Sequence, residues 1–119
     1  MPRPITLHFH DETIGRFADG GYETPWFHVR LASLDPTHAA RMLKVTVYER
    51  AMTPFEDEPE DVYDARADAL LAELQLTEED AFMYSNALQV TFDNGSRYTI
   101  GPAYLEEDLL SFRVGDAVT

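Results

Sequence analysis

Three histidines are the residues of this chain best suited to metal chemistry. His8 and His10 lie two residues apart in a segment that alternates apolar and polar side chains, and His28 lies in a second such segment. Side chains at i and i+2 of a strand share one face, so the three imidazoles could form a zinc or iron site, with Asp11 or Glu12 as an oxygen ligand. Any two polar positions of a strand have this spacing, however, so we expect no metal and no cofactor.

No pattern of catalytic nucleophiles accompanies the histidines. The chain has no cysteine, which excludes a thiol nucleophile, a thiolate zinc site and a disulfide framework. None of the four serines lies in a nucleophile-elbow motif, and Gly95 and Gly101 belong to turns and not to a phosphate-binding loop. Acidic residues are so numerous that no single pair stands out as a general acid and base. We therefore expect a protein that is not an enzyme, and a metal-dependent enzyme centred on His8, His10 and His28 is the third functional alternative.

The charge of the chain is its most informative feature. The formal net charge is −13, yet residues 1–50 carry six bases and six acids and are neutral. The whole excess lies in residues 51–119, and its densest part is EDEPEDVYD at residues 56–64. Carboxylates in the first turn of a helix interact favourably with the helix dipole, which accounts for only part of this run. The rest is either a solvated surface that keeps the protein dispersed or a docking surface.

We interpret the acidic run as a docking surface for a basic partner protein, with Phe55 as an apolar anchor. Such a partner would be a nuclease or another nucleic-acid-binding complex, whose phosphate site a row of carboxylates can occupy. This predicts an inhibitor or immunity-type protein. Direct attraction to nucleic acid or to an anionic membrane is disfavoured by the charge of the chain. The predicted partner-binding residues are Phe55, Glu56, Asp57, Glu58, Glu60, Asp61, Asp64 and Asp68.

The elements that must position these residues follow from hydrophobic periodicity. Apolar and polar residues alternate in six segments, which predicts strands, and Asn94-Gly95 predicts a hairpin between two of them. Residues 11–25 read as a loop, Asp35-Pro36 as the start of a short helix, and 77–86 as either helix or strand. Residues 60–76 have the spacing of an amphipathic helix. The predicted strands are residues 4–10, 26–34, 44–50, 88–92, 97–100 and 109–114.

These elements predict a single α+β domain over residues 1–119. Its five- or six-stranded, mostly antiparallel sheet has one face covered by the helix of residues 60–76, with one or two short helices besides. The uncovered face would carry aromatic and basic residues. That face is either solubilised by cross-strand ion pairs or provides an alternative site for a ligand or nucleic acid. The residues of this alternative site are Trp26, His28, Arg30, Lys44, Tyr48 and Arg50.

The cellular location is predicted from what the sequence lacks. The first residues, MPRPITLHFH, have no apolar run of the kind found in a signal peptide, and no stretch of about 18 apolar residues occurs. Together with the absence of cysteine, this predicts a cytoplasmic protein.

Overall fold

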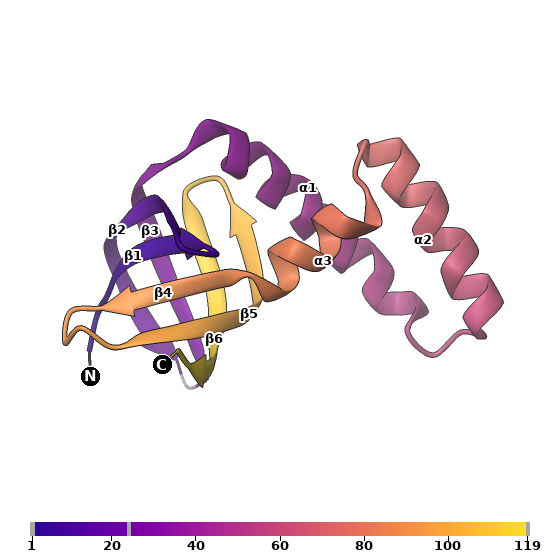
Figure 1. The fold of residues 1–119 in the computed structure, drawn as a ribbon. Coiled ribbons are helices and arrows are strands. Elements are labelled where there is room, and N and C mark those ends of the chain that lie inside the picture. The colour runs from indigo at the N-terminus through magenta and orange to yellow at the C-terminus, as the bar shows by residue number, and fades with distance from the viewer. Residues whose placement is uncertain (1, 24, 119) are drawn as a thin grey trace.

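Six strands form a closed antiparallel barrel in the order β1-β2-β3-β6-β5-β4 (Figure 1). The computed structural model describes residues 2–23 and 25–118. The strands are β1 (Pro4–Phe9), β2 (Glu12–Glu23), β3 (Trp26–Leu34), β4 (Leu88–Phe92), β5 (Arg97–Glu106) and β6 (Leu109–Ala117). The helices lie between β3 and β4 in the chain and are α1 (Pro36–Met52), η1 (Thr53–Phe55), α2 (Glu60–Leu74) and α3 (Glu78–Asn86).

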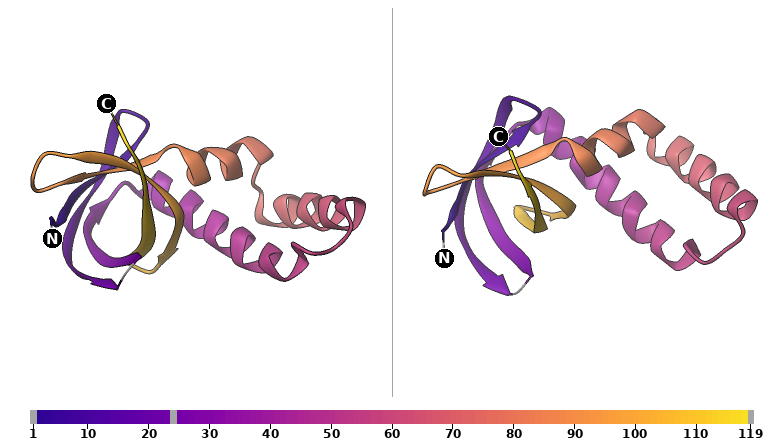
Figure 2. Two further views of the ribbon diagram at one scale, coloured as in Figure 1. Left: turned by 90° about the horizontal axis from the view of Figure 1, so that it is seen from below. Right: turned by 60° about the horizontal axis from the view of Figure 1, so that its bottom comes forward.

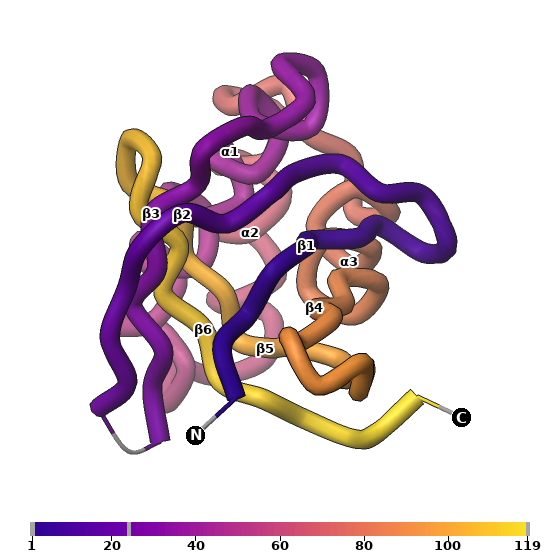
Figure 3. The backbone as a smooth tube through the Cα atoms, turned by 90° about the vertical axis from the view of Figure 1, so that its left-hand side faces the viewer, coloured from indigo at the N-terminus to yellow at the C-terminus, as the bar shows by residue number. Residues whose placement is uncertain are grey.

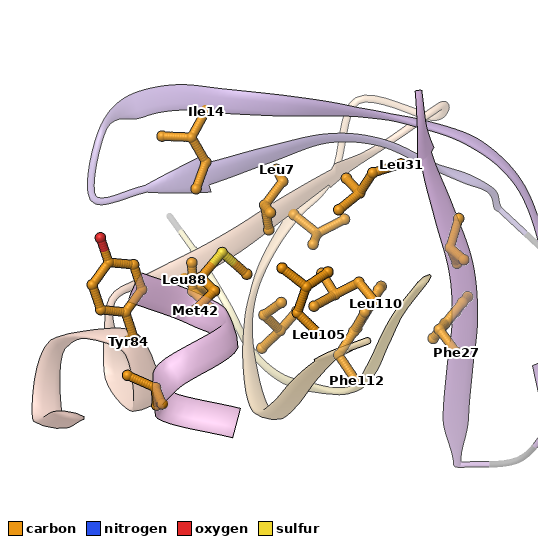
Figure 4. Close-up of a cluster of buried hydrophobic side chains, with 14 of the residues drawn as sticks. Leu7, Ile14, Phe27, Leu31, Met42, Tyr84, Leu88, Leu105, Leu110 and Phe112 are labelled. Atoms are coloured by element: carbon orange, nitrogen blue, oxygen red, sulfur yellow. The ribbon is translucent and has the colours of Figure 1, made fainter. Parts of the chain in front are cut away.

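The predicted open sheet with one covered face is wrong, because β4 pairs with β1 and closes the sheet on itself. Leu7 lies opposite Val90 in this antiparallel pairing. In a closed barrel the inward side chains of opposite strands cover one another, so no helix is needed along a face. Leu7, Leu110 and Phe112 are completely buried in this interior (Figure 4). Val90 is completely buried as well.

Residues 44–50, predicted as a strand, belong to α1. The helix begins as the sequence indicates, because the Asp35 carboxylate accepts hydrogen bonds from the backbone N–H groups of Thr37 and His38, each 3.1 Å long. It continues to Met52 because no proline or glycine interrupts it before Pro54.

The burial pattern along α1 has the helical period. Met42, Val45 and Thr46 are buried at i, i+3 and i+4, whereas the side chain of Val47 is 51% exposed. In a strand, Val45 and Val47 would share a face. The strand prediction rested on the alternation of β-branched residues in this segment. The packing of one face of α1 against the rest of the protein favours a helix in its place.

Residues 12–23 form strand β2 and not the predicted loop. Its register with β3 shifts between Phe17 and Gly20, where the strand bulges. A Cβ atom on Gly20 would lie 2.6 Å from both the His28 carbonyl oxygen and the Val29 Cα atom. Of the two glycines that suggested a turn, Gly20 thus permits a close approach between two strand backbones, whereas a Cβ atom on Gly21 would meet nothing within 4 Å.

Helix α2 forms where the sequence predicts it but does not cover the barrel. It packs on α1 at the far end of the molecule from the strands (Figures 1 and 2). The molecule measures 45 × 28 × 26 Å, and its radius of gyration of 14.7 Å exceeds the value of about 13.5 Å typical of a compact chain of this length. In Figure 3, viewed from the side opposite α2, the helices lie behind the barrel.

The ambiguous segment 77–86 is resolved as helix α3. Thr77 and Asp80 form a reciprocal capping box, with the Asp80 N–H donating to the Thr77 hydroxyl over 3.0 Å. The predicted hairpin between β4 and β5 is present around Gly95. In the part of the chain that the structure describes, no helix combines the length and apolar character that crossing a membrane requires.

A buried hydroxyl joins the helices to the barrel. Thr46 Oγ1 donates a hydrogen bond to the Met42 carbonyl oxygen over 2.9 Å and accepts one from the Leu105 backbone N–H over 2.8 Å. Both Thr46 and Leu105 are buried, so water cannot replace this second bond. This hydrogen bond is therefore a specific buried contact that helps to fix the register of α1 on strand β5.

We predict that Thr46→Val lowers the free energy of unfolding by about 1–3 kcal/mol, because it leaves the buried Leu105 N–H without an acceptor. Thr53→Val is the matched control: Thr53 also donates to the carbonyl four residues earlier but is exposed, so its substitution should cost less than about 0.5 kcal/mol. Urea unfolding followed by circular dichroism measures both. Equal losses in the two variants would contradict the role assigned to Thr46.

Candidate functional site

The strongest concentration of charge lies on the part of the molecule that projects from the barrel. We call residues 53–76, which comprise η1, α2 and the segments that follow each of them, the acidic arm. This segment contains eight acidic residues and one basic residue, Arg66. The seven predicted partner-binding carboxylates all belong to it and are all exposed. The predicted helix that carries four of them is present as α2, but it projects from the barrel and does not cover a sheet.

The carboxylates of the acidic arm are not neutralised by ion pairs within residues 2–23 and 25–118. The ion pairs found there join groups outside the arm, such as Arg30 with Asp108 at 2.6 Å. Arg66 lies over the ring of Phe55, 4.7 Å from its centroid, in a cation–π contact. The predicted apolar anchor Phe55 is therefore half-buried beneath a cation.

A groove of about 450 Å³ opens between α1, α2 and α3, beside the acidic arm. Its lining combines aromatic rings with carboxylates and includes no basic residue. The lining residues used below are Tyr48, Glu49, Tyr63, Asp64, Asp68 and Phe82. Phe82 is the most exposed of the large apolar side chains, at 64%.

The Tyr48 phenol lies in surroundings that disfavour a further negative charge. Its pKa is raised from the ordinary value of 10.0, first by burial and then by the neighbouring Tyr63, Glu49, Glu78 and Asp68. Each of these neighbours opposes the formation of a further negative charge. The groove is therefore set up electrostatically to accept a cation.

The sequence did not reveal this groove. Tyr48 was assigned to the exposed face of a strand, although it lies on α1, and Phe82 fell in the segment whose structure was ambiguous. The sequence offered one signal, a helical spacing that continues from Asp35 beyond Lys44. That spacing places Tyr48 on the helix, about one turn after Lys44, and not on a sheet.

The residues of the alternative site are divided between two elements. Trp26, His28 and Arg30 lie on β3, whereas Lys44, Tyr48 and Arg50 lie on α1, so the prediction that all six share a sheet face is wrong.

The outer face of the barrel nevertheless carries a small aromatic group. The ring of Trp26 lies 6.0 Å from that of Tyr104 and 6.5 Å from that of His28, with interplanar angles of 26° and 15°. Arg30 pairs with Asp108 and Arg50 with Glu106, so two cations expected to bind phosphate are already neutralised.

The three histidines do not converge. His8 is buried, with Nε2 hydrogen-bonded to the hydroxyls of Thr6 and Thr91 and Nδ1 to that of Thr13, at 2.9–3.1 Å. His28 lies beyond the intervening strand β2 and is bonded to Ser111.

Over residues 2–23 and 25–118, moreover, no group of three or more potential ligands is arranged to hold a metal ion. The hydrogen bonds of His8 and His28 indicate that both rings serve as structural polar groups.

Comparison with protein-family models, curated proteins and solved structures finds no match. Function must therefore be argued from the geometry and charge of this chain alone.

The pKa of His8 is lowered, mainly by burial and secondarily by the positive charge of Arg97. The unfolded chain then binds a proton more readily than the folded one. We predict that this contribution to stability is complete above the unfolded value of 6.5 and is lost as the pH falls through 6.5 towards the folded pKa. His8→Gln should therefore lose less stability than the wild type between about pH 7.5 and pH 5.5.

Urea unfolding at the two pH values measures this difference. If His8→Gln retains the full pH dependence, His8 is not the titrating group.

Proposed function

We propose that this chain is a cytoplasmic, non-catalytic binding protein whose acidic arm docks on a basic partner, in the manner of an inhibitor or immunity-type protein. The observation that carries the proposal is the exposed row of carboxylates that no cation of the described chain neutralises. Unneutralised surface charge of one sign speeds encounter with a surface of the opposite sign and disfavours partners of like sign.

The spacing of the charges favours a partner that handles nucleic acid. Glu60, Asp64 and Asp68 recur every four residues of α2, a rise of about 6 Å per step, with Asp61 beside Asp64. The row spans about 12 Å from Glu60 to Asp68 and amounts to one charge per about 4 Å, close to the one per about 3.4 Å of a nucleic-acid strand. A basic groove shaped for phosphates is therefore a suitable counterpart for this helix.

The alternative, a ligand or nucleic-acid site on the outer barrel face, has less support. Trp26 and Tyr104 offer rings for stacking, but Arg30 and Arg50 already pair with carboxylates of the same chain. A phosphate would have to displace those carboxylates.

The proposal predicts that replacing Glu56, Asp57, Glu58 and Asp61 by Gln or Asn slows association with the basic partner by about 10-fold or more at low salt. Loss of long-range attraction is the physical reason, so the dependence of the rate on ionic strength should also become shallower. The fold should be unaffected, because all four side chains are exposed. Stopped-flow association with the partner isolated from the native host measures the rate.

A control variant changes the net charge equally but on the barrel. It replaces four exposed carboxylates outside the arm, namely Asp11, Asp19, Glu107 and Asp116. Its rate should stay within a few-fold of the wild type. Equal slowing by both variants would show that only net charge matters and would contradict a docking role for the arm.

A further inference from the structure

The groove between α1, α2 and α3 suits a more specific ligand than a diffuse positive surface. Its walls bring together Tyr48 from α1, Tyr63 from α2 and Phe82 from α3. Asp64 and Asp68, one helical turn apart on α2, line the same groove. Aromatic faces and carboxylates attract the same kind of group, a cation with a flat, weakly hydrated surface.

We propose that this groove receives an arginine side chain of the basic partner, with the guanidinium against the tyrosine rings and its N–H groups donating to Asp64 and Asp68. The inference rests on the proposed function and adds a site of recognition to it. Arginine fits better than lysine, because the planar guanidinium both stacks on an aromatic ring and hydrogen-bonds to carboxylates through several N–H groups.

The composition of the groove disfavours other occupants. An apolar ligand would remove water from the carboxylates of Asp64, Asp68 and Glu78 without offering them hydrogen bonds or an opposite charge. Such desolvation is costly for charged groups. A phosphate or carboxylate would meet only negative charge. A bare metal ion would lack the convergent ligands, which the described residues do not provide. Phe82, exposed at the rim, offers an apolar surface to the methylene stem of an arginine.

The fixed position of the groove favours a specific contact. Ser85 on α3 donates a hydrogen bond of 3.1 Å to the Glu49 carboxylate on α1, and Ala67 and Leu71 of α2 are buried behind the groove. Three helices therefore hold its walls in place before a ligand arrives. Preorganisation of this kind lowers the entropic cost of binding.

Fluorescence anisotropy with labelled hexa-arginine and hexalysine peptides tests the inference, because the two probes carry equal charge and only one carries guanidinium groups. The wild type should bind hexa-arginine more tightly by about 2- to 30-fold, the range of cation–π contributions. Tyr63→Leu should remove most of this preference while leaving hexalysine binding unchanged. Tyr63→Phe, which keeps the ring, should retain the preference.

Tyr22→Leu is the control, since Tyr22 is an exposed tyrosine on barrel strand β2. It should bind both peptides as the wild type does. Circular dichroism of each variant verifies that the helices are intact.

Three results would overturn the inference, and they differ in whether the proposed function survives. Equal affinity of the wild type for the two peptides would remove the arginine site but leave the acidic arm as a general docking surface. The same holds if Tyr63→Leu keeps the preference. Failure of both peptides to bind even at low salt would overturn the proposed function as well.

Discussion

The hydroxyl of Thr46 links the two parts of this molecule. Within the barrel, inward side chains such as Leu7 and Phe112 are completely buried, in a hydrophobic core to which α1 also contributes. The helices lie between β3 and β4 in the chain, and their direction must be set by specific contacts with the barrel. Thr46 supplies one by accepting the Leu105 N–H, and Met42 and Val45 pack into the same core on either side of that bond. Once α1 is fixed in this way, its last turns extend beyond the barrel and carry α2 with them.

Separation of the acidic arm from the barrel has an energetic consequence. Like charges repel one another in the folded state, and this repulsion opposes folding most strongly where the charged element belongs to the core. In α2 only Ala67 and Leu71 are buried, and its charged side chains are all exposed to solvent, which screens their repulsion. The arrangement allows unneutralised carboxylates to remain exposed. It also places the aromatic groove beside the arm, so that in the function we propose, long-range attraction and a specific contact would act on the same ligand.

Local patterns in the sequence were sufficient for elements whose neighbours along the chain determine them. Alternation identified β1 and β3, Asn94-Gly95 identified the hairpin, and Thr77 with Asp80 identified the start of α3 as one alternative. The failures arose where distant contacts decide. The sequences of β1 and β4 do not show that these two strands pair, because apolar and polar residues alternate in the same way in open and closed sheets. The spacing of Val45 and Val47 is also that of a strand, and only the packing of α1 shows that they belong to a helix. Gly20 suggests a turn in the sequence, and only its position against β3 shows that it lies within a strand. The acidic residues of the site could be predicted because they are close together in the sequence. Its aromatic residues could not, because they come together only where three helices pack against one another.

The central claim, that the acidic arm is the most negative surface of this protein, can be measured residue by residue. Paired cationic and anionic nitroxide cosolutes broaden amide resonances according to the local electrostatic potential, which NMR relaxation then reports along the backbone. The account predicts the most negative potential at the amides of residues 56–68, and a clearly weaker one on the outer face of β3 around Arg30, where cations and carboxylates are paired. A potential that is uniform over barrel and arm, or weaker on the arm, would contradict it.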